Sequence, residues 1–399
     1  MRRRFLLALF ALVAGAAAAP AATPPAQPKA GMPGGADSPN AEVVRRSVGR
    51  ASAATYVFYM AGPSAQPRPV VVLLHAWGAV NPSFYGGWID HLARRGYLVL
   101  FPAFQEVGRT RPVDATASAV SLVKDALAAL ASDPTVQPDL SKVAVLGHSA
   151  GAGIAVSLAA GAKAADLPTP KLVFALMPGG IASDAASRGI QLGDLSAIGP
   201  ATAVVTMVGD REFQASDRAS RRILREASAV PPSQKLFMRA ASDDHGFPAM
   251  SATLASPGSP KEAFDSASIK VEPDPPLDRR APRPQRPKWS ADMVLTGEQT
   301  ILVQQLGRNT TDTLDYLAFW KTFDMAADAA FAGTEMSTLK NDPALVDMAR
   351  WSDGWPVRRL AAETPKAVDP AATAATTPRA APAATKMPVA RQRQTRPRR

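Results

Sequence analysis

The chain has 399 residues, of which 46% are hydrophobic, so it is long enough to form one large domain or two small ones around a sizeable core. Its formal net charge of +11 would suit a nucleic-acid or membrane binder, but ten of these charges lie at the ends. Residues 1–19 carry three arginines, and residues 378–399 carry six arginines and one lysine, so the body is almost neutral. There is no cysteine, which excludes disulfides, thiolate metal sites and a cysteine nucleophile.

The first 19 residues are predicted to be an export signal. Arg2-Arg3-Arg4 precede an apolar run from Phe5 to Ala14, and Ala16-Ala17-Ala18 offers a small-x-small cleavage site. The apolar run is short for a membrane-spanning helix, so a retained anchor is the less favoured alternative. Arg3-Arg4-Phe5-Leu6 partly matches a twin-arginine signal. We therefore expect an exported protein, periplasmic or secreted, using the Sec or the twin-arginine route.

Between residues 51 and 362, apolar runs alternate with helical patterns, which predicts one folded domain. Strands are predicted at 55–59, 70–74, 97–101, 143–146, 171–177, 202–208 and 235–240. Helices are predicted at 83–94, 114–131, 152–160, 217–227 and 311–332. Strands that alternate with helices form a doubly wound, mostly parallel sheet with right-handed crossovers. Such sheets carry their sites on loops at the carboxyl ends of the strands.

Three segments are expected to lie outside this regular pattern. Residues 20–50 begin with a stretch rich in Pro, Ala and Gly and are predicted to be a linker. Residues 256–287 contain eight prolines and lose periodicity, so we expect a long excursion that either caps the site or is disordered. Residues 363–399 are rich in Ala, Pro and Thr and then in Arg, which is typical of a disordered basic tail.

The chain is organised around Gly147-His148-Ser149-Ala150-Gly151, which lies between a predicted strand and a predicted helix. A serine between two glycines at such a switch is the pattern of a nucleophile elbow. The serine takes a strained conformation, so the residues two before and two after it must be nearly free of side chains. Ser149 is therefore the predicted nucleophile, and the Ala150 N–H is predicted to be one donor of an oxyanion hole.

A serine nucleophile needs a base and a carboxylate that orients the base. In elbow enzymes the base follows the serine in the chain, and His245 is the only histidine after Ser149. The carboxylate is expected after the strand 202–208, where the loop offers Asp210 and Glu212. The second oxyanion donor is expected after the strand 70–74, where Trp77 is favoured and His75 is interpreted as structural. The alternative is that Trp77 is a packed core residue.

These residues resemble the α/β-hydrolase superfamily, most closely its dienelactone-hydrolase and polyester-hydrolase-like branches. The matching elements are the turn His75-Ala76-Trp77-Gly78, the elbow, the turn Gly209 to Glu212, and His245-Gly246, within residues 53 to 250. The resemblance implies that the fourth residue of the acid turn, Glu212, orients His245, with Asp210 as the alternative. The chain departs from the family at Ala76, where Gly is usual, and at Glu212, where Asp is usual.

The resemblance and the residues together predict an exported serine hydrolase that cleaves carboxylic esters through an acyl-enzyme. The substrate is expected to be a small-molecule or polymeric ester, and neither a cofactor nor a metal is expected. A peptidase or amidase on the same fold, or a catalytically silent surface-binding protein, is the alternative. The basic tail lacks interleaved aromatic residues, so we expect adhesion to anionic envelope surfaces and no specific binding of nucleic acid.

Overall fold

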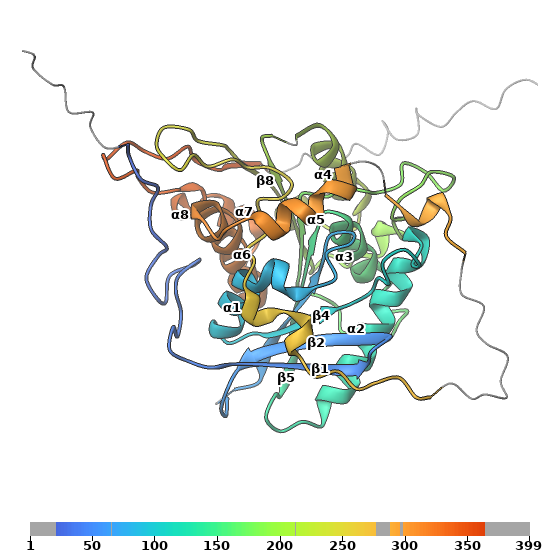
Figure 1. The fold of residues 1–399 in the computed structure, drawn as a ribbon. Coiled ribbons are helices and arrows are strands. Elements are labelled where there is room, and N and C mark those ends of the chain that lie inside the picture. Colours follow the sequence, from blue (N-terminus) through green and yellow to red (C-terminus); the bar gives the residue numbers. More distant parts are fainter. Residues whose placement is uncertain (1–20, 65, 212, 277–287, 296–297, 364–399) are drawn as a thin grey trace, which may run out of the picture. The chain divides into compact units, whose positions relative to one another are not determined.

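The computed structural model describes residues 21–64, 66–211, 213–276, 288–295 and 298–363. Its centre is a nine-stranded sheet in the order β1-β2-β4-β3-β5-β6-β7-β8-β9 (Figure 1). The strands are β1 (Val43–Arg50), β2 (Ala53–Met60), β3 (Arg68–Leu74), β4 (Leu98–Pro102), β5 (Pro138–His148), β6 (Leu172–Leu176), β7 (Ala203–Gly209), β8 (Lys235–Ala240) and β9 (Ala361–Glu363). Strands β3 to β8 run parallel, whereas β1, β2 and β9 pair antiparallel with their neighbours. The predicted α/β class with a mostly parallel sheet is confirmed.

Helices cover both faces of this sheet (Figure 1). One face packs against α1 (Gly86–Arg94) and α6 (Lys321–Ala332), and the other against α2 (Ala115–Ala131), α3 (Ala150–Gly161) and α4 (Phe213–Glu226). Successive side chains of β3 join opposite clusters: Val71 and Leu73 face α1 and α6, and Val70, Val72 and Leu74 face α2 and α3. Burial on both faces explains why the central strands are continuous apolar runs.

Several elements were not predicted from the sequence: β1, α5 (Glu298–Arg308), α7 (Met336–Lys340), α8 (Pro343–Val346) and β9. The helix expected at 311–332 consists of a π-helical stretch, Leu314–Trp320, that continues into α6. Within the described residues, no helix is both long enough and apolar enough to cross a membrane. The predicted signal and nearly all of the predicted tail lie outside the described residues.

The segment predicted to be a linker instead takes part in the fold, and this expectation is corrected. Its second half forms β1, which pairs along its whole length with β2. Its first half is held by polar contacts far along the chain: the Gly34 N–H donates to Asp324 Oδ2 at 2.7 Å, and the Phe247 N–H donates to the Ala22 carbonyl at 2.8 Å. Composition was a poor guide to this segment, because a chain rich in proline and glycine can be extended and still be held in one place by contacts with the rest of the protein.

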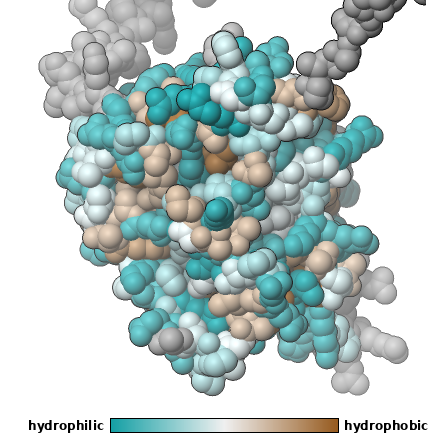
Figure 2. Space-filling view, turned by 90° about the vertical axis from the view of Figure 1, so that its left-hand side faces the viewer, coloured by the Kyte–Doolittle hydropathy of each residue, from teal (hydrophilic) through white to brown (hydrophobic). Residues whose placement is uncertain are grey.

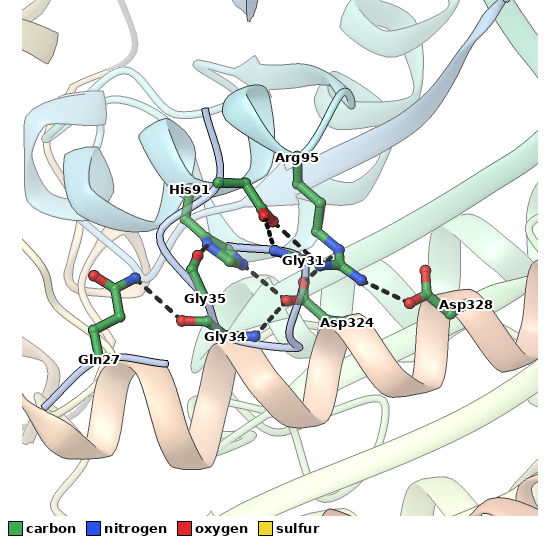
Figure 3. Close-up of polar contacts among 9 residues, drawn as sticks. Gln27, Gly31, Gly34, Gly35, His91, Arg95, Asp324 and Asp328 are labelled. Atoms are coloured by element: carbon green, nitrogen blue, oxygen red, sulfur yellow. Dashed lines mark hydrogen bonds and ion pairs between the residues drawn. The ribbon is translucent and has the colours of Figure 1, made fainter. Parts of the chain in front are cut away.

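Figure 3 shows the main anchor of this segment, which we call the amino-terminal strap (residues 21–42). Asp324 of α6 accepts from Gly34 and pairs with His91 Nε2 at 2.9 Å, and His91 Nδ1 lies 3.1 Å from the Gly35 carbonyl. Arg95 links Asp324 to the more exposed Asp328. The side of the molecule along which the strap runs shows a mixture of apolar and hydrophilic residues on its surface (Figure 2).

The described part of the proline-rich excursion, residues 256–276, lies along α1 and β1. Ser259 Oγ accepts from the Trp88 N–H at 3.1 Å, Lys261 pairs with Asp90 at 2.7 Å, and the Glu272 carbonyl accepts from Ala51. Residues 277–287 lie outside the described residues. Residues 256–276 therefore pack against α1 and beside β1 at one edge of the sheet.

Candidate active site

Ser149 forms a sharp turn between β5 and α3. Its backbone has φ 54° and ψ −114°, a conformation that L-residues rarely adopt. A methyl group on Gly147 would lie 2.2 Å from the Gly151 carbonyl oxygen, and one on Gly151 would lie 2.1 Å from the Leu74 carbonyl oxygen. Both glycines are thus sterically required, as the elbow pattern predicts. Ser149 is fully buried, at the carboxyl end of β5 and at the amino terminus of α3.

The turn after β3 lies directly beside this elbow, because Leu74 pairs with Gly147 in the sheet. Three of its N–H groups are already used: Ala76 donates to Tyr85 Oη at 3.0 Å, Gly78 to Gln105 Oε1 at 2.6 Å, and Ala79 to the Ala76 carbonyl at 2.9 Å. The N–H of Trp77 has no acceptor among the described residues. Among the described residues, the N–H of the predicted oxyanion donor Trp77 is therefore not used by the hydrogen bonds that hold this turn.

The other predicted donor, Ala150, is the first residue of α3. The first N–H groups of a helix have no partner within the helix and point out of its positive end. A developing negative charge beside Ser149 would thus meet both a backbone donor and the helix dipole.

His75 belongs to the core of the turn. Its ring stacks on Phe104 with centroids 4.0 Å apart and an interplanar angle of 7°, and its Nδ1 lies 2.8 Å from the Ala76 carbonyl oxygen. Burial lowers the pKa of His75 to about 4, although the hydrogen bond to Ala76 opposes this change, so the ring is neutral at physiological pH. These contacts agree with the structural role that the sequence suggested.

His245 lies on the loop that follows β8. Its Nε2 is 2.7 Å from Asp353 Oδ2, and its ring stacks on Trp355 with centroids 5.4 Å apart. The Asp353 carboxylate accepts hydrogen bonds from the Trp355 N–H and from His245, and these lower its pKa. Asp353 and Trp355 were missed in the sequence, since no local pattern connects them with a histidine 108 residues earlier. No described contact joins His245 to Ser149.

The loop of His245 is anchored at its start by Asp243, which is buried. The Asp243 carboxylate accepts from the N–H groups of His245 and Arg358 and from the Trp351 indole. Burial raises the pKa of Asp243, but these donors outweigh burial and lower it overall. Asp243 therefore holds the backbone of His245, through the His245 N–H, and makes no described contact with the imidazole.

Of the two candidate orienting carboxylates, the structure describes Asp210 but not Glu212. Both oxygens of Asp210 accept from Ser242, one from its N–H at 2.8 Å and the other from its hydroxyl at 2.5 Å. Asp210 thus closes the loop that leads to His245 and makes no described contact with the imidazole. Glu212 lies outside the described residues.

Residues from the unpredicted part of the chain cover this region. A methyl group on Gly78 would lie 2.9 Å from Val303 of α5, and one on Gly180 would lie 2.6 Å from Leu295. Leu295 is buried in the same cluster as Trp77 and Ala150. The segment around α5, and not residues 256–276, therefore packs on the turn after β3 and beside the elbow.

Other parts of the described structure offer weaker sites. A cavity of about 640 Å³ lies at the amino ends of the central strands, the opposite edge from Ser149, and is lined by Arg94, Arg95, Lys142 and Asp328 among others. Its two arginines are already paired with aspartates. Within the described residues, no group of three or more His, Asp or Glu side chains is placed to hold a metal ion.

A family model described as Chlorophyllase matches residues 38–180, a range that holds both the turn after β3 and the elbow. A comparison with curated proteins found no match. Among solved structures, the chain is similar to fungal esterases from Rhizomucor miehei, at 14% sequence identity over 50% of this chain and 74% of that chain, with a TM-score of 0.39. It is also similar to a thermostable esterase from Pseudomonas putida, at 13% identity over 50% of this chain and 72% of that chain, with a TM-score of 0.38. On its strand order and its strained serine elbow, the chain has the α/β-hydrolase fold.

Proposed function

We propose that the protein is a serine hydrolase that cleaves carboxylic esters through an acyl-enzyme. The observation that carries the proposal is the strained Ser149, which lies at the amino terminus of α3 and beside the turn whose Trp77 N–H has no acceptor among the described residues. A nucleophile with two preorganised backbone donors beside it is what acyl transfer requires. The Chlorophyllase match over residues 38–180 supports the same class of chemistry, because it spans both elements.

In the proposed reaction, Ser149 Oγ attacks the ester carbonyl carbon while its proton passes to His245. The N–H groups of Trp77 and Ala150 hold the resulting oxyanion. The oxyanion collapses, the bond to the alcohol oxygen breaks, and His245 returns the proton to the departing alcohol. Water then attacks the acyl-Ser149 ester by the same route, with His245 again as base, and releases the acid.

Two movements belong to this proposal. Ser149 is fully buried, so a bound ester has to displace neighbouring side chains. His245 has to leave Asp353 and turn toward the Ser149 hydroxyl to take its proton. Breaking the pair costs little free energy, because the side chains of His245 and Asp353 are 30% and 47% exposed. Glu212 is proposed to orient His245, as the family resemblance implies, with Asp210 as the alternative.

The ends of the chain carry a separate proposal. We infer that residues 1–19 direct export and that the arginine-rich end adheres to anionic envelope surfaces, because both segments hold positive charge without any acidic residue.

The experiment combines a fluorophosphonate probe with turnover of p-nitrophenyl esters of increasing acyl length. We expect the probe to label the wild-type protein and not Ser149→Ala. Either Ser149→Ala or His245→Ala should lower turnover about a million-fold, and the double variant should be little worse, because the two residues act as one unit.

Ser157→Ala is the matched control, since Ser157 is a buried serine of the same helix, away from the elbow. It should keep both labelling and turnover. A wild-type protein that neither reacts with the probe nor cleaves any ester would identify a silent surface-binding protein instead. Faster cleavage of p-nitroanilides than of esters would indicate an amidase.

A further inference from the structure

A buried tyrosine outside the predicted triad connects the turn after β3 with the elbow. Tyr85 ends the short 3-10 turn Pro82–Tyr85, and its side chain is almost completely buried. Its hydroxyl oxygen accepts from the Ala76 N–H at 3.0 Å and lies 2.8 Å from Nδ1 of His148, the residue before the nucleophile. One hydroxyl group therefore contacts both loops that supply the oxyanion donors.

The direction of each hydrogen bond follows from the partners. His148 Nε2 lies 2.8 Å from the Leu254 carbonyl oxygen, which can only accept, so Nε2 carries the hydrogen. Burial lowers the pKa of His148 to about 4, so the ring is neutral and Nδ1 is left as an acceptor. The Tyr85 hydroxyl therefore donates to His148 Nδ1 and accepts from Ala76.

This chain of hydrogen bonds ties together three loops at the carboxyl edge of the sheet. It runs from the turn at Ala76, through Tyr85, to His148 in the elbow, and on to Leu254 in the segment that follows the His245 loop. All of these side chains are buried, where each polar group needs its partner and where linked bonds reinforce one another.

The same contacts fix the orientation of the Trp77 N–H. The Ala76 carbonyl oxygen and the Trp77 N–H belong to one planar trans peptide, so they point in opposite directions. That carbonyl oxygen accepts from the Ala79 N–H at 2.9 Å and lies 2.8 Å from His75 Nδ1. The N–H of Ala76, which belongs to the preceding peptide, donates to the Tyr85 hydroxyl oxygen.

We propose that Tyr85 and His148 are positioning residues that preorganise the oxyanion hole of the proposed hydrolase. Neither residue touches the ester. Tyr85 holds the Ala76 N–H, and so the following peptide, at a fixed place relative to Ser149, and His148 anchors Tyr85 from the elbow side. The proposal rests on the ester hydrolase function proposed above, because it assigns these residues to transition-state stabilisation in that reaction.

The kinetic test is Tyr85→Phe, which keeps the ring and removes only the hydroxyl. We expect kcat for a p-nitrophenyl ester to fall on the order of tenfold to a hundredfold, less than for complete loss of an oxyanion donor. KM should stay within about twofold, because the lost interaction acts in the transition state. His148→Gln should behave alike, and the double variant should be little worse than either single one.

Tyr97→Phe is the matched control, since Tyr97 is a buried tyrosine just before β4, at the other end of that strand from the site. It loses a hydroxyl of the same kind without touching the oxyanion turn, so its kcat should be unchanged. An unchanged kcat in Tyr85→Phe, an equal loss in Tyr97→Phe, or an effect confined to KM would overturn the proposal.

A second measurement does not depend on activity. Nitrogen NMR of the four histidines, with His148 assigned through His148→Gln, should show the neutral Nε2–H tautomer of His148 in the wild-type protein. The Nδ1 resonance should move in Tyr85→Phe as its hydrogen bond is lost. An Nδ1–H tautomer, or no shift in the variant, would overturn the hydrogen-bond network even if the protein cleaved no ester. Inactivity with the expected tautomer and shift would instead contradict the hydrolase function, and with it the role in transition-state stabilisation, while the network itself stood.

Discussion

At the level of single residues, Asp210 and Asp353 show how carboxylates near a histidine divide their tasks. Asp210 spends both oxygens on Ser242 and so holds the loop that leads to His245. Asp353 contacts the imidazole itself, but from a partly exposed position on a segment that sequence reasoning did not connect with the site. In a complete triad, a buried carboxylate contacts an imidazole that also contacts the serine. Neither Asp210 nor Asp353 is placed in this way.

We expect substitutions of the three carboxylates to separate these tasks. Glu212→Gln should lower ester turnover about ten-thousand-fold, through loss of the correct imidazole tautomer. Asp210→Asn should keep turnover and lose about 1 kcal/mol of unfolding free energy, as a loop contact does. Asp353→Asn should stay within a few-fold of wild type, because exposed pairs contribute little.

Turnover of a short-chain ester and a melting curve for each variant make the comparison. A folded but inactive Asp210→Asn beside an active Glu212→Gln would transfer the orienting role to Asp210. A folded but inactive Asp353→Asn would show that the His245–Asp353 pair seen here is the working one.

The residues of the elbow could be predicted from the sequence because their requirement is local. Gly147 and Gly151 have no room for a methyl group within a turn of five residues, and such a constraint leaves a mark in the sequence. The importance of Tyr85 could not be predicted, since a tyrosine beside Phe84 on a helical pattern is typical of simple packing. Its role depends on a contact with His148, 63 residues away, that only the folded sheet creates.

At the level of elements, the amino-terminal strap depends on one buried carboxylate. Asp324 of α6 is fully buried and meets the Gly34 N–H, His91 and Arg95. Asp328, one helical turn later, pairs with the same Arg95, but its side chain is 55% exposed. The two aspartates therefore form a natural pair for measuring what burial adds.

We expect Asp324→Ala to lose about 3–5 kcal/mol of unfolding free energy, because it leaves buried polar groups of the strap and of His91 without a partner. Asp328→Ala should lose no more than about 1 kcal/mol, as exposed pairs do. Urea unfolding monitored by tryptophan fluorescence measures both. Equal losses in the two variants would mean that Asp324 does not fix the strap.

Elements with a strong internal pattern were predicted, and those defined by their partners were not. The strand at 235–240 and the helix at 114–131 match β8 and α2 closely, because apolar runs and helical periodicity are local. Strand β1 contains three valines among arginines and is half exposed, so its pairing with β2 defines it. Strand β9 has three residues and exists only through its contact with β8.

At the level of the whole molecule, the buried histidines predict how stability depends on pH. In the folded protein the pKa values of His75 and His148 are both lowered to about 4 by burial, against an ordinary value of 6.5. Below pH 6.5 the unfolded chain therefore binds protons that the folded chain does not, and stability falls as pH falls. The contribution of each histidine, roughly 3 kcal/mol at neutral pH, should be lost between about pH 6.5 and pH 4.

The difference between wild type and His148→Gln isolates this effect from the carboxylates, whose titration both proteins share. We expect the wild type to lose more unfolding free energy than His148→Gln between about pH 7 and pH 4. Ser157→Ala, which alters a buried side chain that does not titrate, is the control and should follow the wild type. Parallel curves for His148→Gln and wild type would show that His148 does not remain neutral in the folded state.

The strap also has a consequence for the order in which the molecule assembles. Thr23 and Ser352 exchange hydrogen bonds across 329 residues, and Gly34 reaches Asp324 across 290. A ribosome releases Thr23 long before it releases its partner, so the first part of the strap waits while the sheet forms behind it. Closing so long a loop is slow, and such contacts tend to form after the folding transition state. Weakening the strap should then mainly accelerate unfolding and leave the rate of folding nearly unchanged.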